Sequence, residues 1–184
     1  GHSKNIEIRA LVLAIGQLRE SIRSGRSFNE ELEALKVLLK EDAKLSAVLM
    51  HSVDELAPIS ITGAPSIENL QYQFAQLAGR IVQVGLIPTD GNWIQKTLAR
   101  LMETVKWRRT SNFVGSGVEA VVARAEQALK SRDVEKTIDE LSVLDEKPAT
   151  VIKEWLANAK AYLIAEKTLS ELQTRAVAQI AAGQ

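Results

Sequence analysis

Five basic side chains and two tryptophans fall within the twenty residues from 91 to 110, alongside a single acid, Glu103. At about 100° per residue on a helix, apolar side chains fill one half of the wheel and cations the other, with Trp107 among the cations. Anionic headgroups attract such cations at about 1 kcal/mol each, and tryptophan prefers the membrane interface. The pattern therefore predicts reversible adsorption to an anionic phospholipid membrane. The side chains expected to make this contact are Trp93, Lys96, Arg100, Lys106, Trp107, Arg108 and Arg109.

One other interpretation of this helix remains open, and a further one is not expected. It can be an ordinary amphipathic helix whose final basic residues interact favourably with the helix dipole. The chain is then a helical protein–protein interaction scaffold with no direct lipid contact, and Trp107 is buried against Phe113 or a neighbouring hairpin. Nucleic acid binding, with Trp107 stacked on a base, is not expected, because the basic patch is one helix long and the net charge is zero.

Catalytic chemistry is not indicated elsewhere in the chain. His51 is a lone histidine, expected at the surface, because His2 belongs to a probable tag remnant and no pair has metal-ligand spacing. The serines best placed for function, Ser27 and Ser66, are accounted for as helix caps. The adjacent carboxylates are expected on different helix faces as solvated charge; they are Glu30–Glu31 and Asp139–Glu140. We therefore expect a non-enzymatic protein without cofactor or metal.

Composition limits the function further. The 184 residues hold 23 basic and 23 acidic side chains, so any electrostatic function is local. There is no cysteine, which excludes disulfides and thiolate chemistry. The longest apolar run, 10–15, is far below the roughly 20 residues that span a bilayer, and no secretory signal pattern is present. Residues 1–3 are typical of a tag remnant, and we expect the chain to be a fragment of a longer protein.

The elements around the basic helix are all predicted to be helical, because apolar residues recur at intervals of three and four and no strand alternation competes. A first helix over 8–22 stops at Ser24–Gly25, and a second begins at Ser27, with Glu30 completing a capping box. Asp42 caps a third helix that Pro58 ends. In the loop 58–66 that follows, Ile59 and Ile61 are expected to turn inward.

The second half is predicted to contain a helical hairpin and one long helix. A fourth helix opens at Ser66, and breaks follow at 86–91 and at Gly115–Gly117, the latter interpreted as a hinge. Helices over 118–130 and 134–144 form a hairpin with Asp133 as N-cap. Pro148 suits the first turn of a last helix that runs to Ala182, about 50 Å long. The predicted fold is an all-α helical bundle with a C-terminal hairpin followed by one long helix.

The last helix carries an apolar stripe that its short neighbours are not expected to cover. A partner helix, from a second subunit or from sequence outside this chain, is the natural cover, which predicts a homo-oligomer, a dimer or higher. The side chains expected to mediate self-association are Ile152, Trp155, Ala159, Tyr162, Leu169 and Leu172.

Three stretches of the C-terminal third resemble the mitofilin family: VKWRRT (105–110), VVARAEQALKSRDVEKTIDELSVLD (121–145) and EWLANAKAYLIAEKTLSEL (154–172). The family's helix–turn–helix pattern is matched at Ala128–Leu129, Asp133, Leu141, Leu144, Trp155 and Ala159. GRSFNEELEAL (25–35) and GAPSIENLQYQF (63–74) are similar to the region before that signature in bacterial members. Arg132 stands where glycine is usual, and Thr137 where alanine is common.

This resemblance implies an inner-membrane protein that organises cristae or intracytoplasmic membranes. It implies an N-terminal transmembrane helix, a coiled-coil stalk, and this portion on the periplasmic or intermembrane-space side. It also implies membrane bending, self-association and contact with an outer-membrane assembly protein. The family's lipid-binding segment precedes the C-terminal signature, which places it at residues 91–110. The expected organisation is a helical region at 4–90, the basic helix and its connection at 91–114, and a mitofilin-like module at 115–184.

Overall fold

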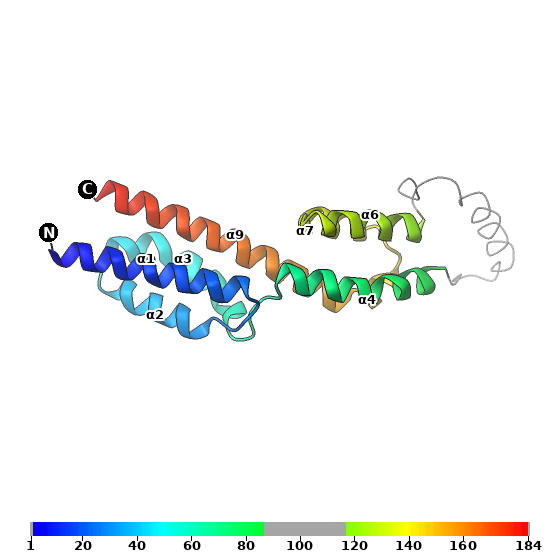
Figure 1. Cartoon of the computed structure of the whole chain (residues 1–184), viewed down its shortest axis with the longest axis horizontal. Helices are drawn as coiled ribbons and strands as arrows, with labels where there is room; N and C mark the ends of the chain where they lie inside the picture. The colour runs from blue at the N-terminus through cyan, green and yellow to red at the C-terminus, as the bar shows by residue number, and fades with distance from the viewer. Residues whose placement is uncertain (1, 87–116, 184) are drawn as a thin grey trace. The chain divides into compact units, whose positions relative to one another are not determined.

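The computed structural model describes residues 2–86 and 117–183, and within these ranges it contains helices and no strand (Figure 1). The all-α prediction is therefore confirmed for the described part of the chain. The helices are α1 (His2–Arg23), α2 (Asn29–Lys40), α3 (Ala43–Ser60), α4 (Ile67–Gly85), α6 (Val118–Lys130), α7 (Val134–Leu141), α8 (Glu146–Val151) and α9 (Lys153–Ala182).

These helices form two compact units. The first comprises Gly1–Ser66 with Lys160–Gln184, and the second comprises Ile67–Ala159. Helix α9 is shared, since it begins in the second unit and ends in the first. These unit boundaries do not coincide with the boundary at residue 115 expected from the sequence. Helices α4 and α6 lie on either side of that residue in the sequence, yet they pack together in the second unit.

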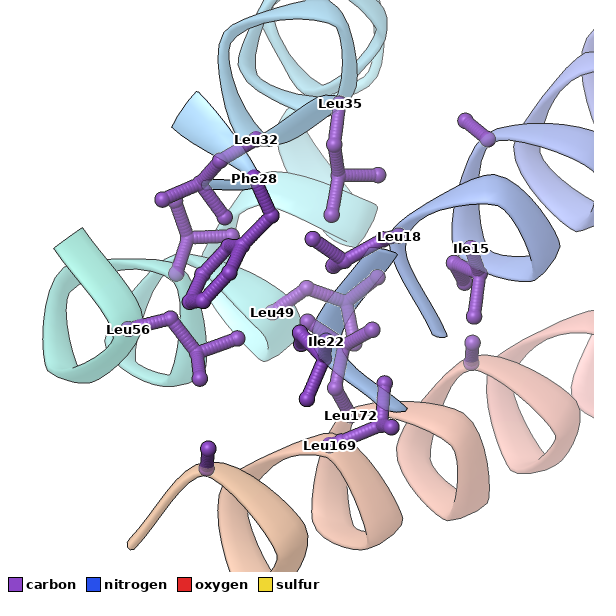
Figure 2. Close-up of a cluster of buried hydrophobic side chains, with 14 of the residues drawn as sticks. Ile15, Leu18, Ile22, Phe28, Leu32, Leu35, Leu49, Leu56, Leu169 and Leu172 are labelled. Atoms are coloured by element: carbon purple, nitrogen blue, oxygen red, sulfur yellow. The ribbon is translucent and has the colours of Figure 1, made fainter. Parts of the chain in front are cut away.

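The first unit packs α1, α2 and α3 against the C-terminal part of α9 around one apolar core (Figure 2). Leu18 and Ile22 of α1 meet Leu35 of α2, Leu49 of α3 and Leu172 of α9 within this cluster. The recurrence of apolar residues at three and four along each helix places one stripe of each toward the common axis. Four stripes together exclude water from a core that no pair of these helices could close alone.

Helix α1 stops before Ser24–Gly25, as the sequence predicts, and its end is a Schellman motif. The backbone N–H of Arg26 donates to the Ser21 carbonyl at 3.3 Å, and that of Gly25 donates to the Ile22 carbonyl at 3.1 Å. Gly25 has φ +75°, which glycine adopts without a Cβ penalty. The predicted cap of α3 is also confirmed, because the Asp42 side chain accepts hydrogen bonds from two backbone N–H groups of the first turn.

Two other predicted helix boundaries are wrong. The N-cap of α2 is Phe28, whose side chain has no hydrogen-bond acceptor, and the hydroxyl of the predicted cap Ser27 instead donates to the Ser60 carbonyl at 3.0 Å. Pro58 does not end α3, which continues to Ser60. Proline lacks a backbone N–H and disturbs the helix around it. Because Pro58 lies only two residues before the end of α3, the helix loses little by containing it.

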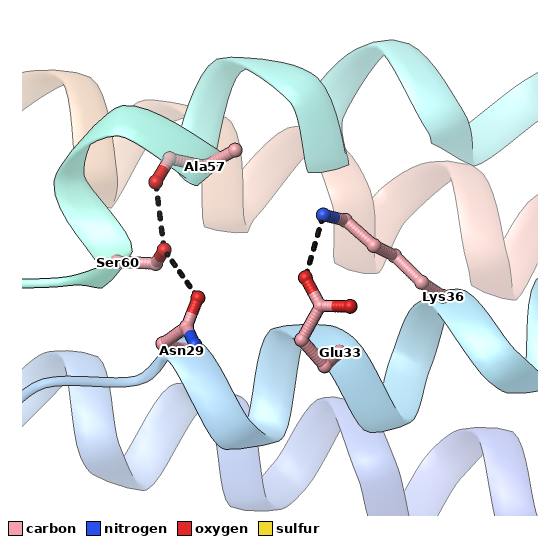
Figure 3. Close-up of polar contacts among 5 residues, drawn as sticks. All are labelled: Asn29, Glu33, Lys36, Ala57 and Ser60. Atoms are coloured by element: carbon pink, nitrogen blue, oxygen red, sulfur yellow. Dashed lines mark hydrogen bonds and ion pairs between the residues drawn. The ribbon is translucent and has the colours of Figure 1, made fainter.

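Ser60 joins the end of α3 to the start of α2 (Figure 3). Its hydroxyl lies 2.7 Å from the Ala57 carbonyl oxygen and 3.3 Å from Asn29 Oδ1. Its carbonyl accepts from the Phe28 backbone N–H at 2.9 Å. These bonds satisfy orphan groups of both helix ends. The Glu33–Lys36 pair in the same view is 2.8 Å long, but such an i,i+3 contact between partly exposed side chains stabilises a helix by only a few tenths of a kcal/mol.

The loop after α3 differs from the prediction at Ile61, which is exposed rather than turned inward, whereas Ile59 is half-buried. Gly63 has φ +76° and lies against the backbone of the preceding α1–α2 connection. A Cβ at this position would lie 2.4 Å from the Arg26 carbonyl oxygen. The loop therefore requires glycine for two reasons, conformation and space.

Polar groups also link the helices of the first unit. The Ser21 hydroxyl donates to Glu31 Oε1 at 2.6 Å, so Glu31 is not the freely solvated charge that the sequence predicts. This bond and a backbone hydrogen bond lower the pKa of the Glu31 carboxyl; burial opposes them, and the nearby Arg26 adds to the lowering. The Thr168 hydroxyl of α9 donates to Glu55 Oε2 of α3 at 3.3 Å. Within the described residues, Ser52 Oγ is buried without a hydrogen-bond partner.

The second unit is built on α4, which contacts both α6 and α8. Ser66 precedes α4, as predicted, and Leu70, Phe74 and Ile81 are buried along one side of it. The predicted long helix starts later than Pro148, which lies in the short helix α8. Ile152, with φ −96° and ψ 2°, separates α8 from α9 and is fully buried. The last helix is consequently 30 residues long, beginning at Lys153.

Candidate functional site

The predicted membrane-binding side chains lie outside the described residues. Trp93, Lys96, Arg100, Lys106, Trp107, Arg108 and Arg109 all belong to residues 87–116, as does Phe113. The described part of the second unit shows where this segment begins and ends.

Helices α4 and α6 run antiparallel, and this arrangement brings the two ends of the segment together. Near the start of α4, Gln71 Nε2 donates to the carbonyl of Leu129, close to the end of α6, at 2.9 Å. At the opposite ends, a Cβ on Gly85 would lie 2.6 Å from a methyl group of Val118. The chain thus leaves α4 and enters α6 at neighbouring points. Residues 87–116 form an insertion between two packed helices rather than a linker between distant ones.

Trp155, in the first turns of α9, holds that helix to α4. Its indole Nε1 donates to the Leu70 carbonyl at 3.0 Å, and its ring lies 5.0 Å from the ring of Phe74, tilted by 59°. Both aromatic rings are almost completely buried. A buried indole needs a hydrogen-bond acceptor for its N–H, and tilted aromatic pairs are favourable beyond the area that they bury. The contact therefore anchors α9 in the second unit.

The hairpin of α6 and α7 confirms the predicted turn. Asp133 caps α7 by accepting from the Lys136 backbone N–H at 2.9 Å. The Thr137 hydroxyl donates to the Asp133 carbonyl at 2.7 Å, which satisfies this buried side chain. Across the hairpin, Arg124 Nε donates to Glu140 Oε2 at 2.8 Å, and both side chains are largely buried. Glu140 is therefore not the solvated charge that the sequence predicts, although its adjacent Asp139 is exposed.

Helix α6 ends in the same Schellman motif as α1, but with arginine at the left-handed position. The backbone N–H of Asp133 donates to the Ala128 carbonyl at 2.9 Å, and that of Arg132 donates to the Leu129 carbonyl at 3.0 Å. Arg132 has φ +63°, which costs a residue with a Cβ about 1 kcal/mol. Its guanidinium reaches Glu68 Oε1 at 3.2 Å, yet both side chains are mostly exposed.

Replacing this residue, Arg132→Gly, should raise the free energy of unfolding by about 0.5 to 1 kcal/mol. Glycine relieves the left-handed conformation, and the exposed ion pair that is lost contributes little. Urea denaturation followed by circular dichroism measures the change. Arg132→Ala is the matched control: it removes the ion pair but keeps the Cβ, so it should not stabilise. A loss of stability in both variants would show that the ion pair outweighs the backbone conformation.

A surface groove of about 570 Å³ lies between α4 and α6. Its floor is apolar, with Phe74 and Leu129, and its rim carries Gln71, Glu126 and Lys130. Glu126 and Lys130 have opposite charges four residues apart, so the groove has no dominant sign. The groove is therefore suited to binding an apolar group, and its lining among the described residues includes no serine, threonine, cysteine or histidine that could act as a nucleophile.

The side chains predicted to mediate self-association are mostly buried within the chain itself. Ile152, Trp155 and Ala159 are buried in the second unit, and Leu169 and Leu172 lie in the core of the first unit. Tyr162 is half-buried. The premise that α9 needs a partner helix does not hold for these five residues, since all of them are buried within the chain: Leu169 and Leu172 pack with α1–α3, and Trp155 contacts α4. Self-association itself stays a prediction.

Catalytic groups do not assemble in the described part of the chain. His51 is mostly exposed, as predicted, and its Nε2 lies 3.4 Å from Glu55 Oε1 one turn away. No group of three histidine, cysteine or acidic side chains that could hold a metal ion occurs among the residues that the structure describes. None of the described helices has both the length and the apolar character needed to cross a bilayer.

Sequence reasoning missed the contacts that hold the second unit together. Arg124 and Glu140 lie eight residues on either side of Arg132, so a hairpin centred on that residue could have predicted their pairing. The close approach of Gly85 to Val118 could not be predicted in this way, because neither the residue types nor their spacing relates the end of α4 to the start of α6, which are separated by residues 86–117.

The fold and this site define an all-α protein in which a helical hairpin packs on α4, and Trp155 joins the same helix to the start of the long helix α9. The sequence model of mitofilin, described as a mitochondrial inner membrane protein, matches residues 2–177. The chain belongs to the mitofilin family.

Curated relatives agree with this assignment. The MICOS complex subunit MIC60 of Pyrenophora tritici-repentis is 26% identical over 176 residues, which cover 94% of this chain and 27% of the relative. Those of Paracoccidioides brasiliensis and Talaromyces stipitatus are each 24% identical and cover 94% of this chain, with 25% and 27% of the relatives covered. The chain thus spans about a quarter of the length of these relatives. No solved structure matches it.

Proposed function

We propose that this chain is a non-enzymatic membrane-organising module that adsorbs to anionic membrane through residues 91–110 and self-associates. Its placement follows the family, on the periplasmic side of an inner membrane, with an outer-membrane assembly protein as a further partner. The curated relatives are named as subunits of one complex, which supports a role in assembly.

The observation that carries the lipid-binding part is the adjacency of Gly85 and Val118 at the two ends of the insertion. The 91–110 stretch within this insertion holds five cations and one acid, whereas the chain as a whole has equal numbers of basic and acidic residues. Because the insertion starts and ends at one place on the α4–α6 pair, the pair can stay packed while the inserted residues meet a headgroup layer. Five cations at about 1 kcal/mol each give reversible adsorption rather than permanent anchoring.

Reversing three of these charges in the Lys96→Glu, Arg100→Glu, Arg109→Glu variant should abolish co-sedimentation with liposomes of phosphatidylglycerol and phosphatidylcholine. The matched control reverses Lys44, Lys136 and Lys153, which are exposed and lie in the first turns of α3, α7 and α9, where glutamate suits the helix dipole. Both triple variants carry the same net charge. If both lose binding equally, general charge rather than this segment is responsible, and if the first variant binds like the parent, the lipid site lies elsewhere.

The second candidate function is a protein-interaction scaffold without lipid contact. The naming of the relatives as complex subunits and the apolar groove between α4 and α6 favour it. The two functions differ in the emission of Trp107, obtained as the difference between the parent and Trp107→Phe, which leaves the buried Trp155 in place. Blue-shifted emission without lipid supports the scaffold, and a blue shift that appears only with anionic liposomes supports adsorption.

A further inference from the structure

Helix α1 carries, directly opposite its buried side, a stripe in which Arg9, Leu13 and Glu20 are exposed and Gly16 is half-buried. Arg9, Leu13, Gly16 and Glu20 recur at intervals of four, three and four, which is the spacing of a helix–helix seam. We call these four residues the outer stripe of α1. On the helical wheel they lie about 180° from the core residues of α1, which include Leu11 and Leu18. The core of the first unit therefore makes no use of the outer stripe.

The chemistry of this stripe is that of an uncovered contact surface. Leu13 is 63% exposed, and Val12 beside it is 58% exposed. A Cβ added to Gly16 would meet no atom within 4 Å, so the backbone at Gly16 is open to close approach by another helix. Within the described residues, neither Arg9 nor Glu20 forms an ion pair. An apolar centre is thus flanked by two unused charges of opposite sign.

The order of these residues is self-complementary. When two copies of α1 cross antiparallel between Ala14 and Ile15, Arg9 faces the second copy's Glu20, and Leu13 faces the second copy's Gly16. Both contacts occur twice, because a two-fold interface repeats each pair. A parallel arrangement would instead bring Arg9 to Arg9 and Glu20 to Glu20. Only the antiparallel arrangement satisfies the charges and fits a large side chain over a glycine.

We propose that the outer stripe of α1 binds a second copy of this chain in an antiparallel α1–α1 contact. This inference rests on the self-association part of the proposed function and is independent of adsorption to lipid. One helix pair buries less than the roughly 1,000 Å² expected of a stable interface, so the contact is weak and depends on concentration. It supplies a surface for self-association that the buried residues of α9 do not.

Charge-reversal substitutions in the full 184-residue chain test this contact, with self-association measured by sedimentation velocity over a concentration series. Arg9→Glu alone places glutamate against glutamate, and Glu20→Arg alone places arginine against arginine. Each variant should weaken self-association by about tenfold or more. An equimolar mixture of the two variants restores both opposite-charge pairs and should associate like the parent. The double variant Arg9→Glu, Glu20→Arg should do so as well.

Two further variants guard against indirect effects. Lys4→Glu makes the same change in net charge as Arg9→Glu on another side of α1 and should leave association unchanged. Gly16→Val has room in the single chain and should weaken association without unfolding it, as judged by circular dichroism. A parent chain that remains monomeric at the highest concentration overturns both this contact and the self-association in the proposed function. Association that persists unchanged in every variant overturns the α1 contact alone, and liposome co-sedimentation reports on lipid binding separately.

Discussion

Replacing Trp155 by alanine should lower the free energy of unfolding by about 3 to 5 kcal/mol, the largest loss expected for any single residue of the second unit. The indole is buried, packs against the Phe74 ring in a tilted arrangement, and donates its N–H to the Leu70 carbonyl. Its removal leaves a cavity and takes a hydrogen bond from a buried backbone oxygen. Thermal and urea unfolding followed by circular dichroism measure the loss independently of tryptophan fluorescence.

Two variants divide this effect into its parts. Trp155→Phe keeps most of the ring but loses the N–H donor, so it should cost less than the alanine variant, about 1 to 3 kcal/mol. Tyr72→Ala removes an aromatic side chain of α4 that is 69% exposed, and it should change stability by less than about 0.5 kcal/mol. If Trp155→Ala left unfolding unchanged but abolished self-association, Trp155 would act between copies of the chain rather than within one.

Gly63→Ala should destabilise the first unit by about 2 to 4 kcal/mol. The backbone there has φ +76°, and the added Cβ would lie 2.4 Å from the Arg26 carbonyl oxygen. Backbone atoms cannot rotate away as a flexible side chain can, so the α1–α2 connection or the loop after α3 has to move. That movement would also disturb the Ser27 hydroxyl bond to the Ser60 carbonyl, which joins the same two segments. Equilibrium urea unfolding gives the change.

Gly79→Ala is the matched control for this substitution. Gly79 lies away from the ends of α4 on its solvent-exposed face, and a Cβ there would meet no atom within 4 Å. Alanine has the higher helix propensity, so this variant should gain about 0.5 to 1 kcal/mol. Equal and small effects of the two substitutions would show that the loop after α3 adapts to a side chain at residue 63.

Features set by neighbours in sequence could be predicted from the sequence alone. Asp42 and Asp133 are followed by helical periodicity, and each caps its helix through bonds that span two or three residues. The stop at Gly25 depends likewise on local backbone conformation. The mitofilin resemblance, carried by the helical pattern around Asp133 and Trp155, is confirmed by the family match.

Features set by distant residues could not be predicted in the same way. Serine is a residue type that favours helix N-caps, but the Ser27 hydroxyl donates to a carbonyl 33 residues away. The apolar stripe of α9 suggested a second subunit because periodicity shows that a face is buried without showing what buries it. Here the cover comes from helices about 100 residues earlier in the chain, as the Thr168–Glu55 and Trp155–Leu70 contacts illustrate.

The shared helix α9 also constrains how the protein is made. The first unit consists of residues from both sides of the second, so α1–α3 are synthesised well before the part of α9 that completes their core. Translation at about 5 to 20 residues per second leaves roughly 5 to 20 seconds in which the apolar faces of α1–α3 are not yet covered by α9. We therefore expect the nascent N-terminal helices to be a client of chaperones at the ribosome. Folding of this unit then has to wait for the last helix to emerge.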